Sequence, residues 1–297
     1  MNYTGTIYRP PFEASSLLLQ VTVGCSHNRC SFCTMYRDIP FRAESTEQIE
    51  NDLKEAALRY RGVTRVFLEN GDPFVLSADK LTRIAELIHQ YLPAVKTVAM
   101  YASIKNIRSK TDAELRRLRD LGINELNIGV ESGYDPALDY MNKGHTSAEA
   151  VSELLRLKKA GIDYGLNVIL GCSGSGNARE NALATAKLLN KTQPYLIFTG
   201  TMHADPGCPL YDDLRSGAFV ENTVGEYLDE EELLIEGLEF ENCRYFGLHP
   251  SNVFRVDAML PGDKKEMLRE LRGLRNCFTK EQLDSRPKRA GEGGIIY

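Results

Sequence analysis

The chain has 297 residues, of which 42% are hydrophobic, and its 41 acidic and 36 basic residues give a formal net charge of −5 at pH 7. This length suits one large α/β barrel or two modest domains. The acidic balance argues against a broad nucleic-acid-binding surface, and no apolar run is long enough to predict a membrane-spanning helix.

Strand-like and helix-like stretches alternate along the first two thirds of the chain. Apolar, β-branched runs predict strands over 16–23, 63–69, 95–102, 123–131, 162–171 and 195–200. Amphipathic stretches predict helices over 46–60, 77–92, 111–122, 147–161 and 177–191, with N-caps at Ser45 or Thr46, Ser77 and Thr111. Strands separated by such helices imply right-handed crossovers and a parallel sheet. The pattern predicts an α/β fold and leaves open whether the sheet is an open barrel or doubly wound.

The pattern changes after residue 200. Residues 204–217 are rich in turn formers, whereas 226–238 and 263–278 have helical periodicity. These features predict a C-terminal helical extension over 216–297, with a Gly-rich, mobile tail from about residue 285.

Three cysteines, Cys25, Cys30 and Cys33, lie close together directly after the first predicted strand. Thiolates are soft ligands that suit iron–sulfur clusters and zinc. A four-iron cluster takes four ligands, so three cysteines would leave one iron open to a cofactor or substrate. The loop also follows a strand, at the end where α/β proteins place their chemistry.

Other interpretations of the three cysteines remain open. They could form a zinc site with His27, although structural zinc sites usually take ligand pairs from separated segments. They could also be unligated thiols. A ferredoxin-like electron carrier would need a fourth cysteine nearby. The alternative to an enzyme is therefore a zinc- or Fe–S-stabilised α/β protein that binds a partner or transfers electrons.

The cysteine loop resembles the signature of the radical S-adenosylmethionine (SAM) superfamily, in which an aromatic residue, here Phe32, precedes the last cysteine. The resemblance implies a partial (β/α)6 TIM-like barrel over residues 1–215 that the C-terminal extension closes. It also implies a [4Fe-4S] cluster held by Cys25, Cys30 and Cys33, with Phe32 near the adenine of SAM. Such enzymes cleave SAM reductively to a 5′-deoxyadenosyl radical, which abstracts a hydrogen atom from the substrate. The gap of four residues between the first two cysteines departs from the common gap of three.

The end of the second predicted strand resembles another superfamily motif. Asn70, Gly71 and Asp72 resemble its Gly-Gly-Glu segment, which implies contact with the amino group of SAM. Backbone carbonyls and a carboxylate suit a cationic amine, and glycine allows close approach. The alternative is a plain Asn-Gly-Asp-Pro turn.

The ends of later predicted strands add further resemblances. Glu131 and Ser132 fall in a Gly-x-Glu-Ser-Gly segment that precedes Asn-Lys-Gly, which implies that Glu131 contacts the ribose hydroxyls or amine of SAM. Asn167 lies in the segment that resembles the fifth-strand motif and is a candidate ribose contact. Residues 206–211 resemble the Pro-Gly-Thr-Pro-Leu-Tyr segment that closes the barrel, with Cys208 in place of threonine.

Known branches of the superfamily have features that this sequence lacks. Anaerobic coproporphyrinogen oxidase has a fourth loop cysteine where this chain has Met35. Methylthiotransferases, cobalamin-dependent members and tRNA-acetylating relatives carry further domains, and other members carry additional grouped cysteines. We therefore expect a minimal-core radical SAM enzyme whose substrate, small or macromolecular, and catalytic residues are unknown. We also expect an electron donor such as flavodoxin or ferredoxin and, because an odd number of cysteines fits a reducing compartment, a cytoplasmic location.

Overall fold

The computed structural model describes residues 1–287, so most of the predicted mobile tail lies outside the described residues. The chain divides into two compact units. The first unit consists of Met1–Asn28, Met35–Ile128 and Ser152–Tyr164. The second consists of Arg29–Thr34, Gly129–Val151 and the chain from Gly165 onward.

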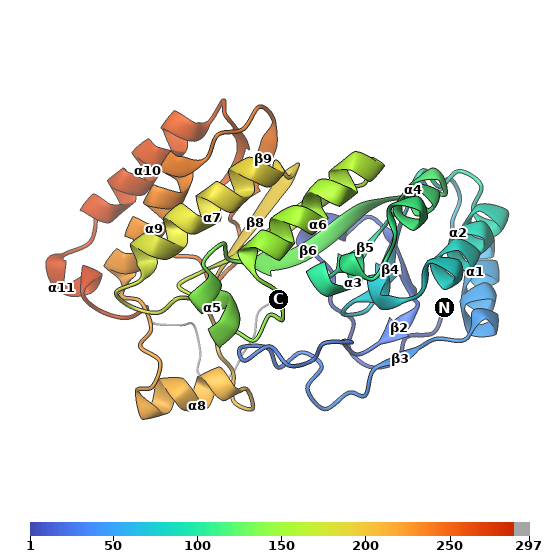
Figure 1. The fold of residues 1–297 in the computed structure, drawn as a ribbon, viewed down its shortest axis with the longest axis horizontal. Helices are drawn as coiled ribbons and strands as arrows, with labels where there is room; N and C mark the ends of the chain where they lie inside the picture. The colour runs from blue at the N-terminus through green and yellow to red at the C-terminus, as the bar shows by residue number, and fades with distance from the viewer. Residues whose placement is uncertain (288–297) are drawn as a thin grey trace. The chain divides into compact units, whose positions relative to one another are not determined.

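A parallel sheet forms the centre of the first unit (Figure 1). Its strand order is β1 (Leu17–Gln20), β4 (Arg65–Glu69), β5 (Thr97–Ala102) and β6 (Ile123–Glu131). The helices between these strands are α1 (Thr46–Arg59), α2 (Ala78–Tyr91), α3 (Ile104–Arg108) and α4 (Asp112–Asp120). Two 3-10 turns, η1 (Pro11–Glu13) and η2 (Pro73–Val75), and a short antiparallel pair, β2 (Thr22–Val23) with β3 (Arg42–Ala43), complete the unit.

The two faces of this sheet differ in character. In-register residues of neighbouring parallel strands share a face, and residues alternate along each strand. One face carries the buried apolar residues Leu19, Val66, Leu68, Val98, Met100, Leu126 and Ile128. The other face carries polar residues among apolar ones: Gln20, Arg65, Glu69, Tyr101, Glu125 and Asn127. Helices α1, α2 and α4 pack side by side, and α1 contacts β1.

Parallel strands continue in the second unit. Strand β8 (Leu196–Thr201) pairs parallel with β7 (Asp163–Leu170) and with β9 (Cys243–Phe246), and β10 (Asp257–Leu260) runs antiparallel to β9. Helix α6 (Ser147–Ala160) leads into β7, and Ser152–Tyr164, which include most of α6 and the start of β7, belong to the first unit. The other helices are α5 (Asp135–Tyr140), α7 (Ala178–Thr192), α8 (Pro209–Ser216), α9 (Val224–Gly237), α10 (Lys264–Asn276) and α11 (Lys280–Leu283), with α9 packed between α7 and α10.

Hydrogen bonds of the backbone explain where the structure departs from the predicted elements. The first predicted strand is divided into β1 and β2, because the Val21 amide donates to the carbonyl of Glu69 while β2 pairs with β3 instead. Helix α8 forms in the stretch predicted to be rich in turns, with Cys208 as N-cap and Pro209 in its first turn. Strands β9 and β10 lie within 216–297, and the proposed domain boundary at 215 stays a prediction.

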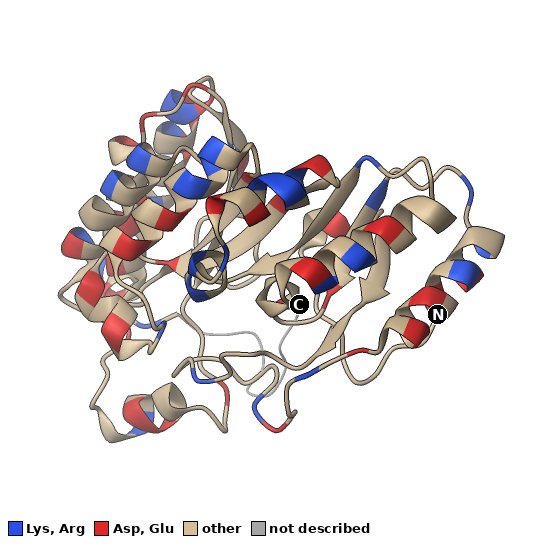
Figure 2. Cartoon of the chain, turned by 45° about the vertical axis from the view of Figure 1, so that its right-hand side comes forward, with Lys and Arg blue, Asp and Glu red and all other residues tan. Residues whose placement is uncertain are grey.

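The predicted helix caps are confirmed. The side chains of Ser45, Ser77 and Thr111 accept hydrogen bonds from the backbone amides of Gln48, Lys80 and Glu114. These bonds satisfy amides that have no partner inside the helix. Both signs of charge are interspersed along the helices (Figure 2). Within residues 1–287, no helix is both long enough and apolar enough to cross a membrane.

Candidate functional site

Gly71 lies directly against the first cysteine of the loop. A Cβ atom built on Gly71 would lie 3.0 Å from Cys25 Cβ, 2.7 Å from Cε2 of Tyr36 and 3.1 Å from the carbonyl oxygen of Gly24. Such distances leave no room for a side chain, so this position needs glycine. The structure thus brings together two residues of the predicted site, Gly71 and Cys25.

Alanine at position 71 is expected to lower stability and weaken SAM binding. The added methyl would have to displace the Tyr36 ring or the cysteine loop, and overpacking of this kind costs about 1–3 kcal/mol. Thermal unfolding and the KM for SAM measure the two effects. Gly273→Ala is the matched control, because its Cβ would meet nothing within 4 Å in helix α10. Equal thermal unfolding midpoints for Gly71→Ala and Gly273→Ala would contradict the close packing of Gly71 against Tyr36 and Cys25.

Tyr36 holds the segment that contains Gly71 in place. Its hydroxyl donates to Oδ1 of Asn70 at 2.7 Å, and its carbonyl accepts from the side-chain amide of Asn28 at 2.7 Å. The backbone amide of Asn70 donates to Oγ1 of Thr22 at 3.0 Å. Sequence reasoning missed Tyr36, because no motif contains it and its partners are distant along the chain.

Asp72 is a buried carboxylate with one oxygen that lacks a hydrogen-bond partner among the described residues. Its Oδ2 accepts hydrogen bonds from Ser26 Oγ, at 3.1 Å, and from the side-chain amide of Asn106. Its Oδ1 is buried and accepts none from the described residues. Burial raises the pKa of this carboxyl to about 6, against the effect of neighbouring hydroxyl donors and of the Lys110 charge. A buried acceptor without a donor suits an N–H donor of a ligand, above all a cationic one.

In the second unit, two motif-like segments hold the loop that carries Cys30 and Cys33. The side-chain amide of Asn142 donates to the Arg29 carbonyl at 3.0 Å, and the Ser31 amide donates to the Met141 carbonyl at 3.0 Å. The Leu210 amide donates to the Ser31 carbonyl at 3.0 Å. The Asn-Lys-Gly segment and the segment 206–211 therefore fix this part of the loop.

Glu131 and Phe32 both approach Lys143. Glu131 ends strand β6 with φ +65°, and its Oε1 accepts from Lys143 Nζ at 3.0 Å. The same Nζ lies 5.9 Å from the centre of the Phe32 ring. Phe32 packs on a buried apolar cluster: Ala137, Leu138, Met141, Cys172, Met202, Ala204, Cys208, Leu210 and Phe219. Lys143 was not among the predicted site residues, although the Asn-Lys-Gly segment contains it.

Ser132 belongs to a buried hydrogen-bond network that reaches helix α9. Its Oγ donates to Asn181 Oδ1 at 2.5 Å, and Asn181 Nδ2 donates to Glu230 Oε1 at 2.6 Å. The Glu230 carboxylate also accepts from the amide of Gly171, just after β7, and from Asn222 Nδ2 at 3.0 Å. The network links the ends of β6 and β7 to α9, which sequence reasoning had not connected with the site.

Glu231, next to Glu230 and equally buried, predicts a dependence of stability on pH. Its Oε1 accepts from the Tyr245 hydroxyl at 2.7 Å, and burial raises its pKa from the usual 4.5 to about 8. Between these values the folded protein holds a proton that the unfolded chain releases, so this group's contribution to stability is lost as the pH rises. Glu231→Gln should gain stability relative to the wild type from about pH 5 to pH 8, by up to about 1.4 kcal/mol per pH unit.

Urea unfolding of both proteins across this range measures the difference. The exposed Glu241→Gln is the control. A difference between Glu231→Gln and the wild type that stays constant with pH would contradict the buried, protonated state of Glu231.

The structure does not bring the remaining predicted site residues, Asn167 and the three cysteines, together in one group. Asn167 is half-buried on β7, in register with Phe198 of β8. Cys25 belongs to the first unit, whereas Cys30 and Cys33 belong to the second. Among the described residues, no three His, Cys, Asp or Glu side chains form a group that could hold a metal ion. The cluster ligands therefore stay a prediction.

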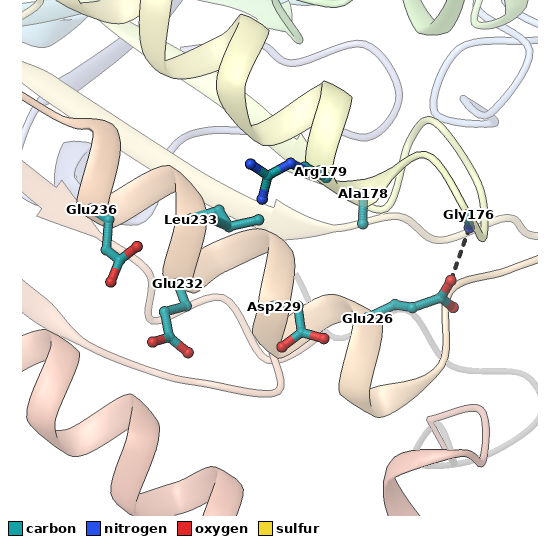
Figure 3. Close-up of a pocket in the computed structure, with 8 residues that line it drawn as sticks. All are labelled: Gly176, Ala178, Arg179, Glu226, Asp229, Glu232, Leu233 and Glu236. Carbon is teal, nitrogen blue, oxygen red and sulfur yellow. Dashed lines mark hydrogen bonds between the residues drawn. The ribbon is translucent and has the colours of Figure 1, made fainter.

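A groove of about 430 Å³ between α7 and α9 is lined by acidic residues (Figure 3). These acids already have partners. Glu226 accepts from Ser175 and from the amide of Gly176, Asp229 pairs with Arg275, and Glu232 and Glu236 pair with Arg272. The groove is therefore not assigned to the reaction.

A model of the radical SAM superfamily matches residues 19–189, more than half of the chain. This chain belongs to the radical SAM superfamily. From this membership we infer that the chain uses a [4Fe-4S] cluster and SAM, cleaves SAM reductively and abstracts a hydrogen atom from its substrate.

The curated relatives of this radical SAM chain include tRNA-modifying enzymes. The tRNA-2-methylthio-N(6)-dimethylallyladenosine synthase of Shewanella sediminis (strain HAW-EB3) is 26% identical over 95% of this chain and 59% of its own length. That of Idiomarina loihiensis is 28% identical over 68% of this chain and 43% of its own length. The chain spans about half the length of these relatives.

Solved structures confirm the fold of this superfamily member. The methyltransferase TsrM of Kitasatospora setae, with cobalamin and a [4Fe-4S] cluster bound, has a TM-score of 0.56 at 14% identity, over 68% of this chain and 39% of its own. Methylornithine synthase (PylB) has a TM-score of 0.53 at 17% identity, over 92% of this chain and 83% of its own. With the parallel β/α units, this likeness confirms the predicted α/β, partial-barrel class.

Proposed function

We propose that Cys25, Cys30 and Cys33 hold the [4Fe-4S] cluster of this radical SAM enzyme. We further propose that SAM is bound by Phe32, Asn70, Gly71, Asp72, Glu131, Ser132 and Asn167. The approach of Gly71 to Cys25 carries the proposal, because it puts the segment predicted to bind SAM against a predicted cluster ligand. The half-buried thiols and the soft character of sulfur fit an iron–sulfur cluster.

Several of these side chains carry groups that suit part of SAM. The bound cluster supplies one-electron reduction of the sulfonium group. Asp72 Oδ1 accepts a hydrogen bond from the amino group and holds its charge. Glu131, held by Lys143, accepts from the ribose hydroxyls, and Phe32 packs beside the adenine. Ser132 keeps the end of β6 in place through Asn181 and Glu230.

The electron comes from outside this chain in our proposal. A small reductant such as flavodoxin or ferredoxin would deliver it to the cluster. We place the protein in the cytoplasm, which the odd number of cysteines supports, because a reducing compartment keeps thiols available as cluster ligands.

The proposal is tested by loading the protein with iron and sulfide without oxygen. The loaded protein is expected to hold about four irons and four sulfides. SAM should then bind and change the electron paramagnetic resonance spectrum of the reduced cluster. About one zinc without sulfide would instead support the zinc-stabilised alternative.

Methylthiolation of a tRNA adenosine is a second candidate. The observation that favours it is the alignment of 95% of this chain with the Shewanella sediminis synthase. Reconstituted protein reduced with dithionite and incubated with SAM, a sulfide source and N(6)-dimethylallyladenosine-containing tRNA would yield 2-methylthio nucleosides in digests analysed by mass spectrometry. Without that product, and with SAM cleaved, the reaction belongs to another substrate.

A further inference from the structure

A row of polar side chains crosses one face of the first unit's sheet, near the carboxyl ends of the strands. Gln20 of β1 is in register with Glu69 of β4, and Tyr101 of β5 is in register with Asn127 of β6. Glu69 and Tyr101 directly follow the paired residues Leu68 and Met100, which joins the two pairs into one row.

Two members of the row have buried polar atoms without partners. Glu69 is 0% exposed and Asn127 is 1% exposed. Neither oxygen of Glu69, and neither Oδ1 nor Nδ2 of Asn127, makes a hydrogen bond to any described residue. Buried polar groups are nearly always hydrogen-bonded, because leaving them unpaired costs free energy. Four such atoms in one row call for a partner that is not part of the chain.

Three other polar side chains on the same face, Arg65, Glu125 and Gln20, are hydrogen-bonded. Arg65 donates to Glu13 at 2.9 Å and also pairs with Glu125. Gln20 exchanges hydrogen bonds with the backbone of Thr4, at 2.6 and 3.1 Å. Among these residues, the buried atoms without partners belong to Glu69 and Asn127, and the half-buried Tyr101 lies between them in the row.

The row lies near the predicted cluster ligand of the same unit. The Tyr36 ring contacts the Gly71 position. Burial is the main cause that raises the pKa of Tyr36, and the nearby Tyr101, Glu69 and Cys25 raise it further. These four side chains are thus close enough to interact electrostatically. A substrate on the row would lie near the chemistry that starts at Cys25.

Glu69 is a neutral acid at pH 7. Burial raises its pKa to about 8, with Arg9 opposing the shift and Glu13 adding to it. A protonated carboxyl has one O–H donor and one acceptor oxygen, and the amide of Asn127 likewise has N–H donors and one acceptor. The Glu69 carboxyl and the Asn127 amide therefore each match a ligand group that has a hydrogen-bond donor beside a hydrogen-bond acceptor.

We propose that Glu69, Tyr101 and Asn127 form the substrate-recognition site, and that they bind a planar amide or lactam edge, in which an N–H donor lies beside a C=O acceptor. This inference rests on the proposed function, because it names the substrate class of the same SAM-cleaving enzyme. Tyr101 would pack its ring on the planar group while Glu69 and Asn127 pair with its edge.

Uracil and nicotinamide are the probes, added at millimolar concentration to reconstituted protein that holds SAM. Each is expected to raise the thermal unfolding midpoint of the wild type by about 2–4 °C. Glu69→Leu and Asn127→Leu should lose the shift, whereas Glu69→Gln should keep it, because glutamine retains a donor and an acceptor. Glu125→Gln, on the same face, is the matched control and should keep the shift. Tyr101→Leu removes the ring that packs on the planar group, so a reduced shift is expected, whereas Tyr101→Phe keeps the ring and should keep the shift.

Three outcomes would overturn the inference: no shift in the wild type, a shift that survives both leucine variants, or a shift with methylammonium alone that Glu69→Gln abolishes. The last outcome would indicate a cationic substrate. Formation of 5′-deoxyadenosine by the same wild-type sample after reduction with dithionite separates the two proposals. If SAM is cleaved and no probe binds, the substrate class is wrong; if SAM is not cleaved, the proposed function itself fails.

Discussion

Replacing Cys30 with serine is expected to remove the cluster-dependent visible absorption of the reconstituted protein and to lower SAM cleavage at least about a hundredfold. Changes in groups that only support metal ligands already cost about 10–100-fold, and a hydroxyl is a poor substitute for a thiolate that binds iron directly. Cys25→Ser and Cys33→Ser should behave in the same way. Iron and sulfide content and 5′-deoxyadenosine yield are the measurements.

Cys277→Ser is the control for this series. Cys277 is exposed near the end of helix α10, and its Sγ contacts only the carbonyl of Gly273 among the hydrogen bonds found for it. This variant should load a full cluster and cleave SAM at the wild-type rate. Full cluster loading by Cys30→Ser would show that the ligand set has been assigned to the wrong residues.

Removing the two candidate SAM carboxylates together should separate SAM binding from cluster binding. In Asp72→Asn with Glu131→Gln, both side chains keep their shape and lose their charge. Asp72 would no longer offer a carboxylate to the amino group of SAM, and Lys143 would lose its anionic partner. Loss of one partner from a buried charged pair costs about 2–5 kcal/mol, so kcat/KM for SAM should fall roughly thirtyfold or more.

The cluster of this double variant should be intact, as judged by iron content and visible absorption. Asp79→Asn with Glu241→Gln is a matched change of two charges at exposed positions and should leave kcat/KM unchanged. An unchanged KM for SAM in the double variant would mean that neither carboxylate contacts SAM. Loss of the cluster would mean that the two residues support the metal site instead.

Much of the fold follows from local patterns in the sequence. The helices predicted over 46–60 and 77–92 form as α1 and α2, because Ser45 and Ser77 cap amphipathic segments. The strand predicted over 123–131 is β6. Local patterning did not reveal β9, which pairs with β8 although the two are separated by helices α8 and α9. Such pairing depends on the register of distant strands and not on local composition.

The candidate site was predictable only where a motif marks it. Gly71 is conspicuous in sequence, and the structure shows why a side chain does not fit there. Tyr36 and Glu230 contribute through hydrogen bonds to Asn70 and Asn181, which lie far along the chain, so no spacing indicates them. Glu69 appeared to be only the last residue of a strand. Its significance depends on burial and missing partners, which only the three-dimensional structure provides.

Formation of 5′-deoxyadenosine from SAM tests the central claim most directly. Protein reconstituted without oxygen, reduced with dithionite and given SAM should yield 5′-deoxyadenosine and methionine in equal amounts, and Cys30→Ser prepared in the same way should yield only background. A wild-type sample with a full [4Fe-4S] cluster that binds SAM and yields no 5′-deoxyadenosine would contradict the account.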